Sequence, residues 1–136
     1  MQKNSKDVVI VSALRTVIGK YNGIWAKIEA HNLGKSVIQN ILFQSKVNQS
    51  SIDEVVMGQV LTGGTGQNPA RQAAKGAGIP DEKTAYVINQ VCGSGLRAII
   101  SGYQSILLND SKIVIAGGQE NMSFSNQDNM LQDGLI

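Results

Sequence analysis

The sequence has few of the residues that form disulfide bonds or bind metal ions. Its 136 residues include one cysteine and one histidine. An internal disulfide therefore cannot form, and a Cys/His metal site would lack ligands, so we expect no metal. A lone cysteine fits a reducing compartment, and we predict a cytoplasmic protein.

Long apolar runs and clustered charges are also missing. The first apolar run, residues 8–11, is far too short for a signal peptide or a membrane span, and we expect no membrane partner. The formal net charge is only +2, and no basic run interleaves with aromatic residues. Nucleic acid is therefore not an expected partner.

The residues that are present are those of a folded domain. Hydrophobic residues make up 42% of the chain and charged residues 16%, with only two prolines. This composition is typical of globular rather than disordered proteins, and the length suits one hydrophobic core.

Apolar β-branched segments alternate with helical patterns along the chain. This order predicts an α/β layered fold with a mostly parallel sheet and helices on both faces. The predicted strands are residues 8–13, 55–61, 85–91 and 113–116, and the predicted helices are residues 30–44, 69–76 and 92–107. We expect this βαβαβαβ domain to span residues 1–118, and the polar residues 119–136 to begin a loop region.

Cys92 stands where a predicted strand turns into a glycine-rich helix. The free N–H groups and the positive dipole end of a helix favour a thiolate over a thiol, which makes a cysteine nucleophilic. Gly93 and Gly95 leave space beside the sulfur, and backbone N–H groups there could bind an oxyanion. The pattern suits acyl transfer with Cys92 as the nucleophile.

Two other interpretations of this segment stay open. Free cysteines are most often small buried hydrophobic residues, and Cys92 could be one. Gly93, Gly95 and Ala98 also satisfy a loose G-x-G-x-x-A dinucleotide pattern. That pattern needs an acidic residue at the end of the next strand, where Gly117 and Gly118 stand before Glu120 arrives.

Five segments taken in order resemble the thiolase family, specifically its biosynthetic acetoacetyl-CoA type. The most specific is the cysteine segment, because related condensing enzymes vary the residues around their cysteine. The segments are Val9 to Gly19, Met57 to Leu61, Gly66 to Ala74, Asn89 to Ala98 and Ala116 to Ser123.

The resemblance implies one of the two α/β halves of the thiolase fold, with Cys92 carrying the acyl group as a thioester and its backbone N–H in the oxyanion hole. The substrates would be acetyl-CoA and acetoacetyl-CoA, and coenzyme A would not be retained as a cofactor. A homodimer or homotetramer is implied, with the cysteine segment near the subunit interface. Residues expected to shape the site are Asn89, Gly93, Ser94, Gly95, Glu120 and Met122.

The resemblance also implies catalytic groups that this sequence does not supply. Removing the proton α to a thioester carbonyl needs a base. In the family that base is a second cysteine, and a histidine activates the nucleophile; both lie in the C-terminal half. Residues 128–135 resemble a family segment normally found further downstream, so we expect a truncated or shortened chain. The alternative is a non-catalytic thiolase remnant or interaction domain.

Overall fold

The computed structural model describes residues 7–125 of the chain. Helices and strands follow in alternation, with the 3-10 turn η1 (Gln49–Ser51) between the first helix and the first strand. The strands are β1 (Glu54–Gly58), β2 (Thr84–Ile88) and β3 (Val114–Gly118). The helices are α1 (Ala30–Ser45), α2 (Pro69–Gly76), α3 (Ser94–Leu107) and the single turn α4 (Met122–Ser125).

The three strands form one parallel sheet in the order β2-β1-β3. Val55 of β1 is in register with Ala85 of β2 and with Ile115 of β3. α2 and α3 supply the long crossovers that parallel strands require. All three strands therefore end at the same edge of the sheet, and the segments that follow them become neighbours.

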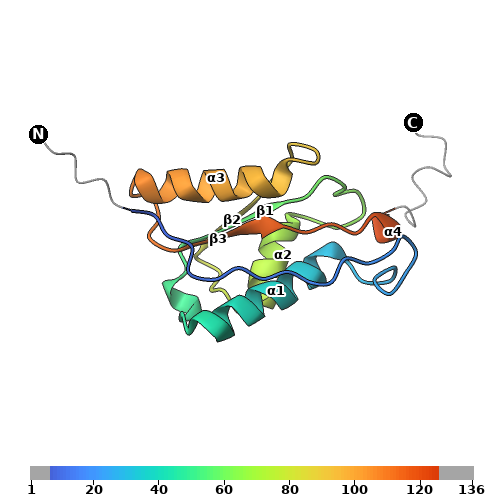
Figure 1. Cartoon of the computed structure of the whole chain (residues 1–136), viewed down its shortest axis with the longest axis horizontal. Helices are drawn as coiled ribbons and strands as arrows, with labels where there is room; N and C mark the ends of the chain where they lie inside the picture. The colour runs from blue at the N-terminus through green and yellow to red at the C-terminus, as the bar shows by residue number, and fades with distance from the viewer. Residues whose placement is uncertain (1–6, 126–136) are drawn as a thin grey trace, which may run out of the picture.

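Helices cover both faces of the sheet, with α3 on one side and α1 and α2 on the other (Figure 1). Val55 and Met57 of β1 are almost fully buried in the core between the sheet, α1 and α2, where Ile38 and Leu42 join them. The predicted α/β fold with helices on both faces is confirmed.

Small residues let α3 approach the opposite face of the sheet. A Cβ atom on Gly58 of β1 would lie 2.5 Å from the Gly95 nitrogen. A Cβ atom on Gly102 would lie 2.9 Å from a methyl carbon of Val114, and Ala98 between them is fully buried. This close contact fixes the start of α3 above the carboxyl end of β1.

The helices begin and end close to the predicted positions. α1 was expected over residues 30–44 and runs over Ala30–Ser45. The predicted cap of α2 is confirmed, because the Asn68 carboxamide oxygen accepts a hydrogen bond from the Arg71 N–H at 3.0 Å and Pro69 occupies the first helical position. Between residues 7 and 125, none of the helices has the length and apolarity that a membrane crossing requires.

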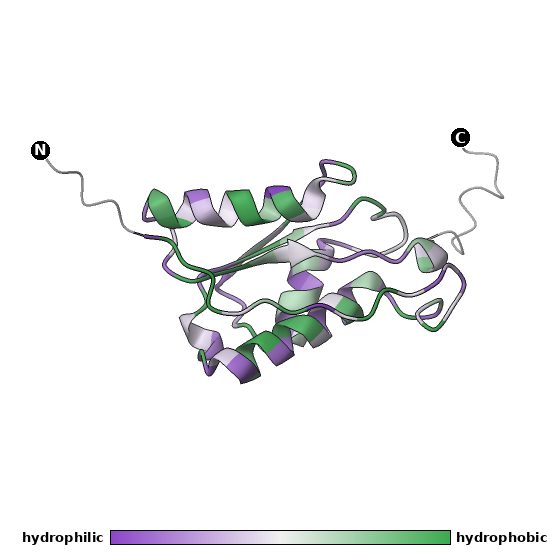
Figure 2. Ribbon diagram, in the orientation of Figure 1, coloured by the Kyte–Doolittle hydropathy of each residue, from purple (hydrophilic) through white to green (hydrophobic). Residues whose placement is uncertain are grey.

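The prediction of a strand over residues 8–13 is wrong. The segment belongs to no strand, and Val9, Ile10 and Val11 are 70%, 80% and 73% exposed. Figure 2 shows this apolar stretch in green at the start of the described chain. Its apolar, β-branched residues favour burial in a sheet, but a strand also needs a hydrogen-bonded neighbour, and within residues 7–125 it has none.

The strands predicted over residues 55–61 and 85–91 extend beyond the observed ends of β1 at Gly58 and of β2 at Ile88. The N–H groups of Val60 and Leu61 donate to the Glu120 carboxylate instead of to a neighbouring strand. Val91 has a φ of 50°, in the left-handed region, where an extended strand cannot continue. In both segments the sequence stays apolar beyond the point where the backbone leaves the sheet.

Gly58→Ala is expected to destabilise the fold by about 2 kcal/mol, because the new methyl group would overlap the backbone at the start of α3. Urea unfolding followed by circular dichroism measures this loss. Gly117→Ala is the matched control: Gly117 also lies in a strand of the sheet, and its added Cβ would meet no atom within 4 Å. Equal losses for the two variants would contradict the packing argument.

Asp53 ties the entry of β3 to the entry of β1. Its carboxylate accepts hydrogen bonds from the Lys112 and Ile113 N–H groups at 2.8 and 3.1 Å. These two bonds hold the pKa of Asp53 below its ordinary value of 3.8, with a further contribution from Lys83. A lowered folded pKa means that this stabilisation is present above the unfolded value and lost as the pH falls through the folded one.

Asp53→Asn is therefore expected to cost about 1 kcal/mol at neutral pH, a modest value because the side chain is partly exposed and screened. Urea unfolding should show the difference from wild type shrinking once the pH falls below 3.8. Asp81→Asn, which removes a carboxylate that is 71% exposed and pairs with Lys75, should have a smaller effect. A difference that stays constant with pH would rule out the proposed linkage.

Candidate active site

Cys92 lies in the turn between β2 and α3, and its side chain is exposed. α3 begins at Ser94, two residues later than the predicted start. The turn therefore adjoins the amino-terminal end of α3, where helix N–H groups carry partial positive charge. In Figure 1 it lies at the right-hand end of α3, near the loop that follows β1. The exposure contradicts the interpretation of Cys92 as a small buried hydrophobic residue.

The residue before the cysteine has a strained backbone. Val91 has a φ of 50°, a region that β-branched residues rarely adopt. Its N–H donates to the Asn89 carboxamide oxygen at 3.0 Å. Its carbonyl oxygen accepts from the Ser94 hydroxyl at 2.6 Å and from the Ser94 N–H at 3.1 Å. Both polar groups of Val91 are thus held by neighbouring residues.

Ser94 is the central side chain of this turn. It is only 4% exposed, and its hydroxyl oxygen accepts a hydrogen bond from the Gln90 N–H at 2.8 Å while donating to Val91. The Gly93 N–H closes the turn by donating to the Gln90 carbonyl at 3.1 Å. The sequence predicted Ser94 as a site-shaping residue, and the structure places it inside the turn.

Glu120 reaches the same region from the end of β3. Its two carboxylate oxygens accept hydrogen bonds from the Val60 N–H at 2.8 Å and the Leu61 N–H at 3.3 Å. Asn89 donates its side-chain N–H to the Val60 carbonyl at 3.2 Å. Val60 thus lies between two of the predicted site-shaping residues. Because the Glu120 carboxylate bonds to protein N–H groups, it is not free to bind a ribose as the dinucleotide interpretation requires.

The next residue inward, Gln119, anchors Glu120. Its backbone N–H donates to the Gly58 carbonyl at 2.9 Å. Its side-chain amide donates to the Gln59 side chain at 2.9 Å and to the Pro69 carbonyl at 3.1 Å. The Gln119 carboxamide oxygen lies against Gly34 of α1, where an added Cβ would clash with it. Gln119 is buried, so this network fixes where Glu120 leaves the sheet.

The other three residues that the sequence predicts to shape the site are Gly93, Gly95 and Met122. Gly93 caps α3 with a φ of −85°, which any residue can adopt. Gly95 faces the sheet, and an added Cβ there would make only ordinary van der Waals contact with Gly118 at 3.7 Å, so packing among the described residues does not require glycine at this position. Met122 begins α4 and is 60% exposed, and it takes no part in the hydrogen bonds of the Cys92 turn.

The single histidine is engaged elsewhere. His31 is in the first turn of α1, with its Nε2 atom 3.3 Å from the Glu29 carboxylate. Within residues 7–125, no three His, Cys, Asp or Glu side chains come together in an arrangement that could hold a metal ion.

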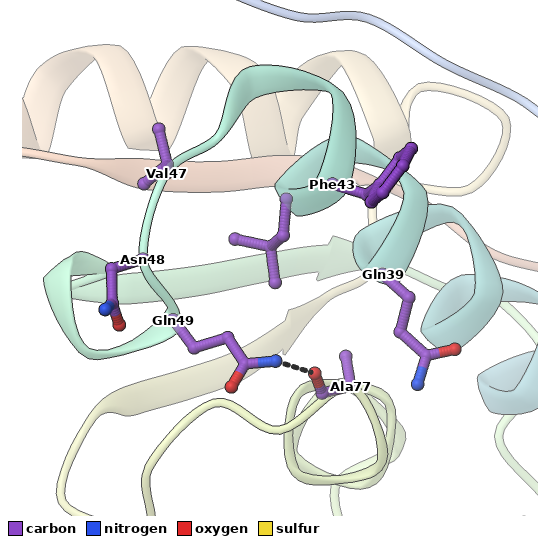
Figure 3. A pocket seen from close by; sticks show the side chains of 7 residues that line it. Gln39, Phe43, Val47, Asn48, Gln49 and Ala77 are labelled. Atoms are coloured by element: carbon purple, nitrogen blue, oxygen red, sulfur yellow. Dashed lines mark hydrogen bonds between the residues drawn. The ribbon is translucent and has the colours of Figure 1, made fainter.

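The surface of residues 7–125 includes the following two hollows. One of about 360 Å³ adjoins Asn89 at the carboxyl end of the sheet, and its remaining lining residues are Gln59, Thr62, Gly66, Asn68, Pro69 and Val87. The other, about 450 Å³, lies between the end of α1, η1 and Ala77, where Gln49 donates to the Ala77 carbonyl at 3.1 Å (Figure 3). Neither hollow is lined by Cys92 or by a charged residue.

The backbone contacts of Val60, Leu61 and Val91 are the part of the site that the sequence did not predict. Apolar side chains carry no signal for a backbone N–H or carbonyl that binds a side chain. Their partners, the polar residues Asn89 and Glu120 that follow strands, were the only feature of the sequence that could have indicated these contacts.

The sequence pattern that defines the thiolase N-terminal domain matches residues 8–133. With that match, a parallel α/β sheet and an exposed cysteine where a strand turns into a helix, the chain belongs to the thiolase family. The resemblance noted from the sequence motifs is confirmed.

Several similar proteins are named acetyl-CoA acetyltransferase. Acetyl-CoA acetyltransferase from Rhizobium meliloti is 49% identical over 122 residues, which cover 90% of this chain and 31% of the relative. The cytosolic acetyl-CoA acetyltransferase of Rattus norvegicus is 50% identical over 123 residues, with the same coverage. The crystal structure of the Bacillus anthracis acetyl-CoA acetyltransferase has a TM-score of 0.81 at 37% identity, over 85% of this chain and 29% of that one. The chain spans about a third of the length of the curated relatives it matches.

Proposed function

We propose that the chain contributes the nucleophile for acyl transfer between coenzyme A thioesters. The observation that supports this most directly is the exposed Cys92 at the amino-terminal end of α3, in a chain about half identical to acetyl-CoA acetyltransferases. The proposed reaction is the condensation of two acetyl-CoA molecules to acetoacetyl-CoA and coenzyme A, together with the reverse thiolysis. Coenzyme A takes part as a substrate and is not retained.

In the first step the Cys92 sulfur attacks the thioester carbonyl of acetyl-CoA. A carbon–sulfur bond forms to Cys92, the bond to the coenzyme A sulfur breaks, and coenzyme A leaves as a thiolate that takes a proton. The backbone N–H of Cys92 would stabilise the negative oxygen of the tetrahedral intermediate. The product of this step is an acetyl thioester on Cys92.

The second step needs groups beyond this chain. A base must remove a proton α to the carbonyl of a second acetyl-CoA, and the resulting carbanion attacks the Cys92 thioester and releases the thiol. The sequence has no second cysteine, and His31 pairs with Glu29 at the start of α1. We therefore propose that turnover requires catalytic groups from a longer protein and that the 136-residue chain alone is inactive. A non-catalytic remnant or interaction domain is the alternative.

Incubation with acetyl-CoA is expected to acetylate Cys92 slowly, because this chain holds the nucleophile, whereas the histidine that activates it in the family lies in the C-terminal half. Mass spectrometry of the intact chain and of its peptides would locate the acetyl group, and Cys92→Ser should remain unmodified. Thiolysis of acetoacetyl-CoA, followed by the loss of its absorbance, should be negligible. The absence of acetylation would favour the non-catalytic alternative, and robust turnover abolished by Cys92→Ser would contradict the proposed need for further groups.

We also propose that the chain forms homo-oligomers. Among residues 7–125, α3 carries an apolar face that no other element covers, and its residues remain 37–65% exposed, namely Leu96, Ile99, Ile100, Tyr103 and Leu107. Such a face is expected to associate with another surface. β2 is also an edge strand among the described residues, and it leads directly into the Cys92 turn.

Light scattering after gel filtration is expected to give a mass of about two or four times 14.5 kDa. Ile99→Glu should return the mass to that of one chain, because it places a charge on the apolar face of α3. Gln104→Glu is the control, since it adds the same charge to the same helix at a residue that is already polar and exposed. A single-chain mass for the wild type at high concentration would refute the proposed association.

A further inference from the structure

Three segments that are distant in sequence are linked by side chains at the carboxyl edge of the sheet. Glu120 follows β3, Val60 follows β1, and Asn89 follows β2. Glu120 accepts from the Val60 N–H at 2.8 Å, and Asn89 donates to the Val60 carbonyl at 3.2 Å. Because β1 is the central strand, this link crosses the whole sheet in the order of its strands.

The end of this link holds the strained residue beside the nucleophile. The Asn89 carboxamide oxygen accepts the Val91 N–H at 3.0 Å. Val91 is 65% exposed, so packing within residues 7–125 does little to hold its backbone in the left-handed region. Hydrogen bonds must do so instead, and one of them comes from Asn89.

We propose that Asn89 and Glu120 are positioning residues for Cys92. Glu120 fixes the Val60 peptide, Val60 orients the Asn89 amide, and Asn89 keeps Val91 in the conformation that presents Cys92 at the amino-terminal end of α3. This inference rests on the proposed function in that it treats Cys92 as the nucleophile. Through these contacts, the residues that follow all three strands together set the position of the Cys92 sulfur.

The chemistry of the two side chains suits these tasks. A carboxylate offers two acceptor oxygens, which match the two adjacent N–H groups of Val60 and Leu61. A carboxamide has one acceptor and one donor group, and Asn89 uses both, accepting from Val91 and donating to Val60. Glu120→Gln would keep the shape of the side chain but turn a donor toward one of the two N–H groups.

The test is the rate at which iodoacetamide alkylates Cys92 in the full 136-residue chain near neutral pH. Asn89→Ala and Glu120→Gln are each expected to slow alkylation by about ten-fold, within the range by which helix N-termini change cysteine reactivity. Gln104→Ala is the control, because Gln104 is an exposed polar residue of α3 outside the Cys92 turn, and this variant should leave the rate unchanged. Circular dichroism would verify that the variants are folded.

A second variant separates positioning from a general role in folding. Glycine adopts a positive φ without strain, so Val91→Gly should make the turn independent of Asn89. The double variant Asn89→Ala/Val91→Gly is therefore expected to regain most of the alkylation rate that Asn89→Ala loses. If Asn89→Ala alone does not fold, the double variant is expected to fold and to react at close to the wild-type rate.

Wild-type alkylation rates in Asn89→Ala and Glu120→Gln would overturn the proposal. So would a double variant that is as slow as Asn89→Ala, or that fails to fold. The alkylation test uses no coenzyme A thioester, so its result is independent of acyl transfer. If alkylation follows the expected pattern while acetyl-CoA leaves Cys92 unmodified, the positioning roles hold and the proposed function fails.

Discussion

The close contact between α3 and the sheet is the constraint on which the rest of the site depends. Gly58 permits it, because any side chain at this position of β1 would meet the backbone of Ser94 and Gly95. With α3 held at this distance, the turn before it must leave β2 and reverse within a few residues. The strained φ of Val91 and the buried hydroxyl of Ser94 are the local consequences of that short path.

A second layer of constraint comes from polar groups at the carboxyl edge of the sheet. Buried Gln119 fixes the exit of β3, and Glu120 then binds the backbone that leaves β1. Backbone groups near a sheet edge need partners as much as those within it, and here side chains provide them. The same bonds that satisfy these groups connect the three strand ends to the cysteine turn.

The sequence was sufficient for the features that depend on local chemistry. The Asn68 cap, the extent of α1 and the turn at Cys92 all follow from residue type and spacing. It was insufficient wherever the outcome depended on a partner distant in the chain. Residues 8–13 have the composition of a strand but no neighbour within residues 7–125, and the strained conformation of Val91 follows from tertiary contacts that no local propensity describes.

The origin of these contacts bears on how the cysteine turn could be transferred to another protein. A peptide copied from residues 89–95 would carry Asn89 and Ser94 but not Val60 or Glu120, which lie 29 residues before Asn89 and 31 residues after it. Without them the Asn89 amide would have nothing to orient it, and Val91 could relax to an ordinary conformation. A graft would have to include the residues that follow all three strands. The cysteine motif is only the part of this arrangement that is contiguous in the sequence.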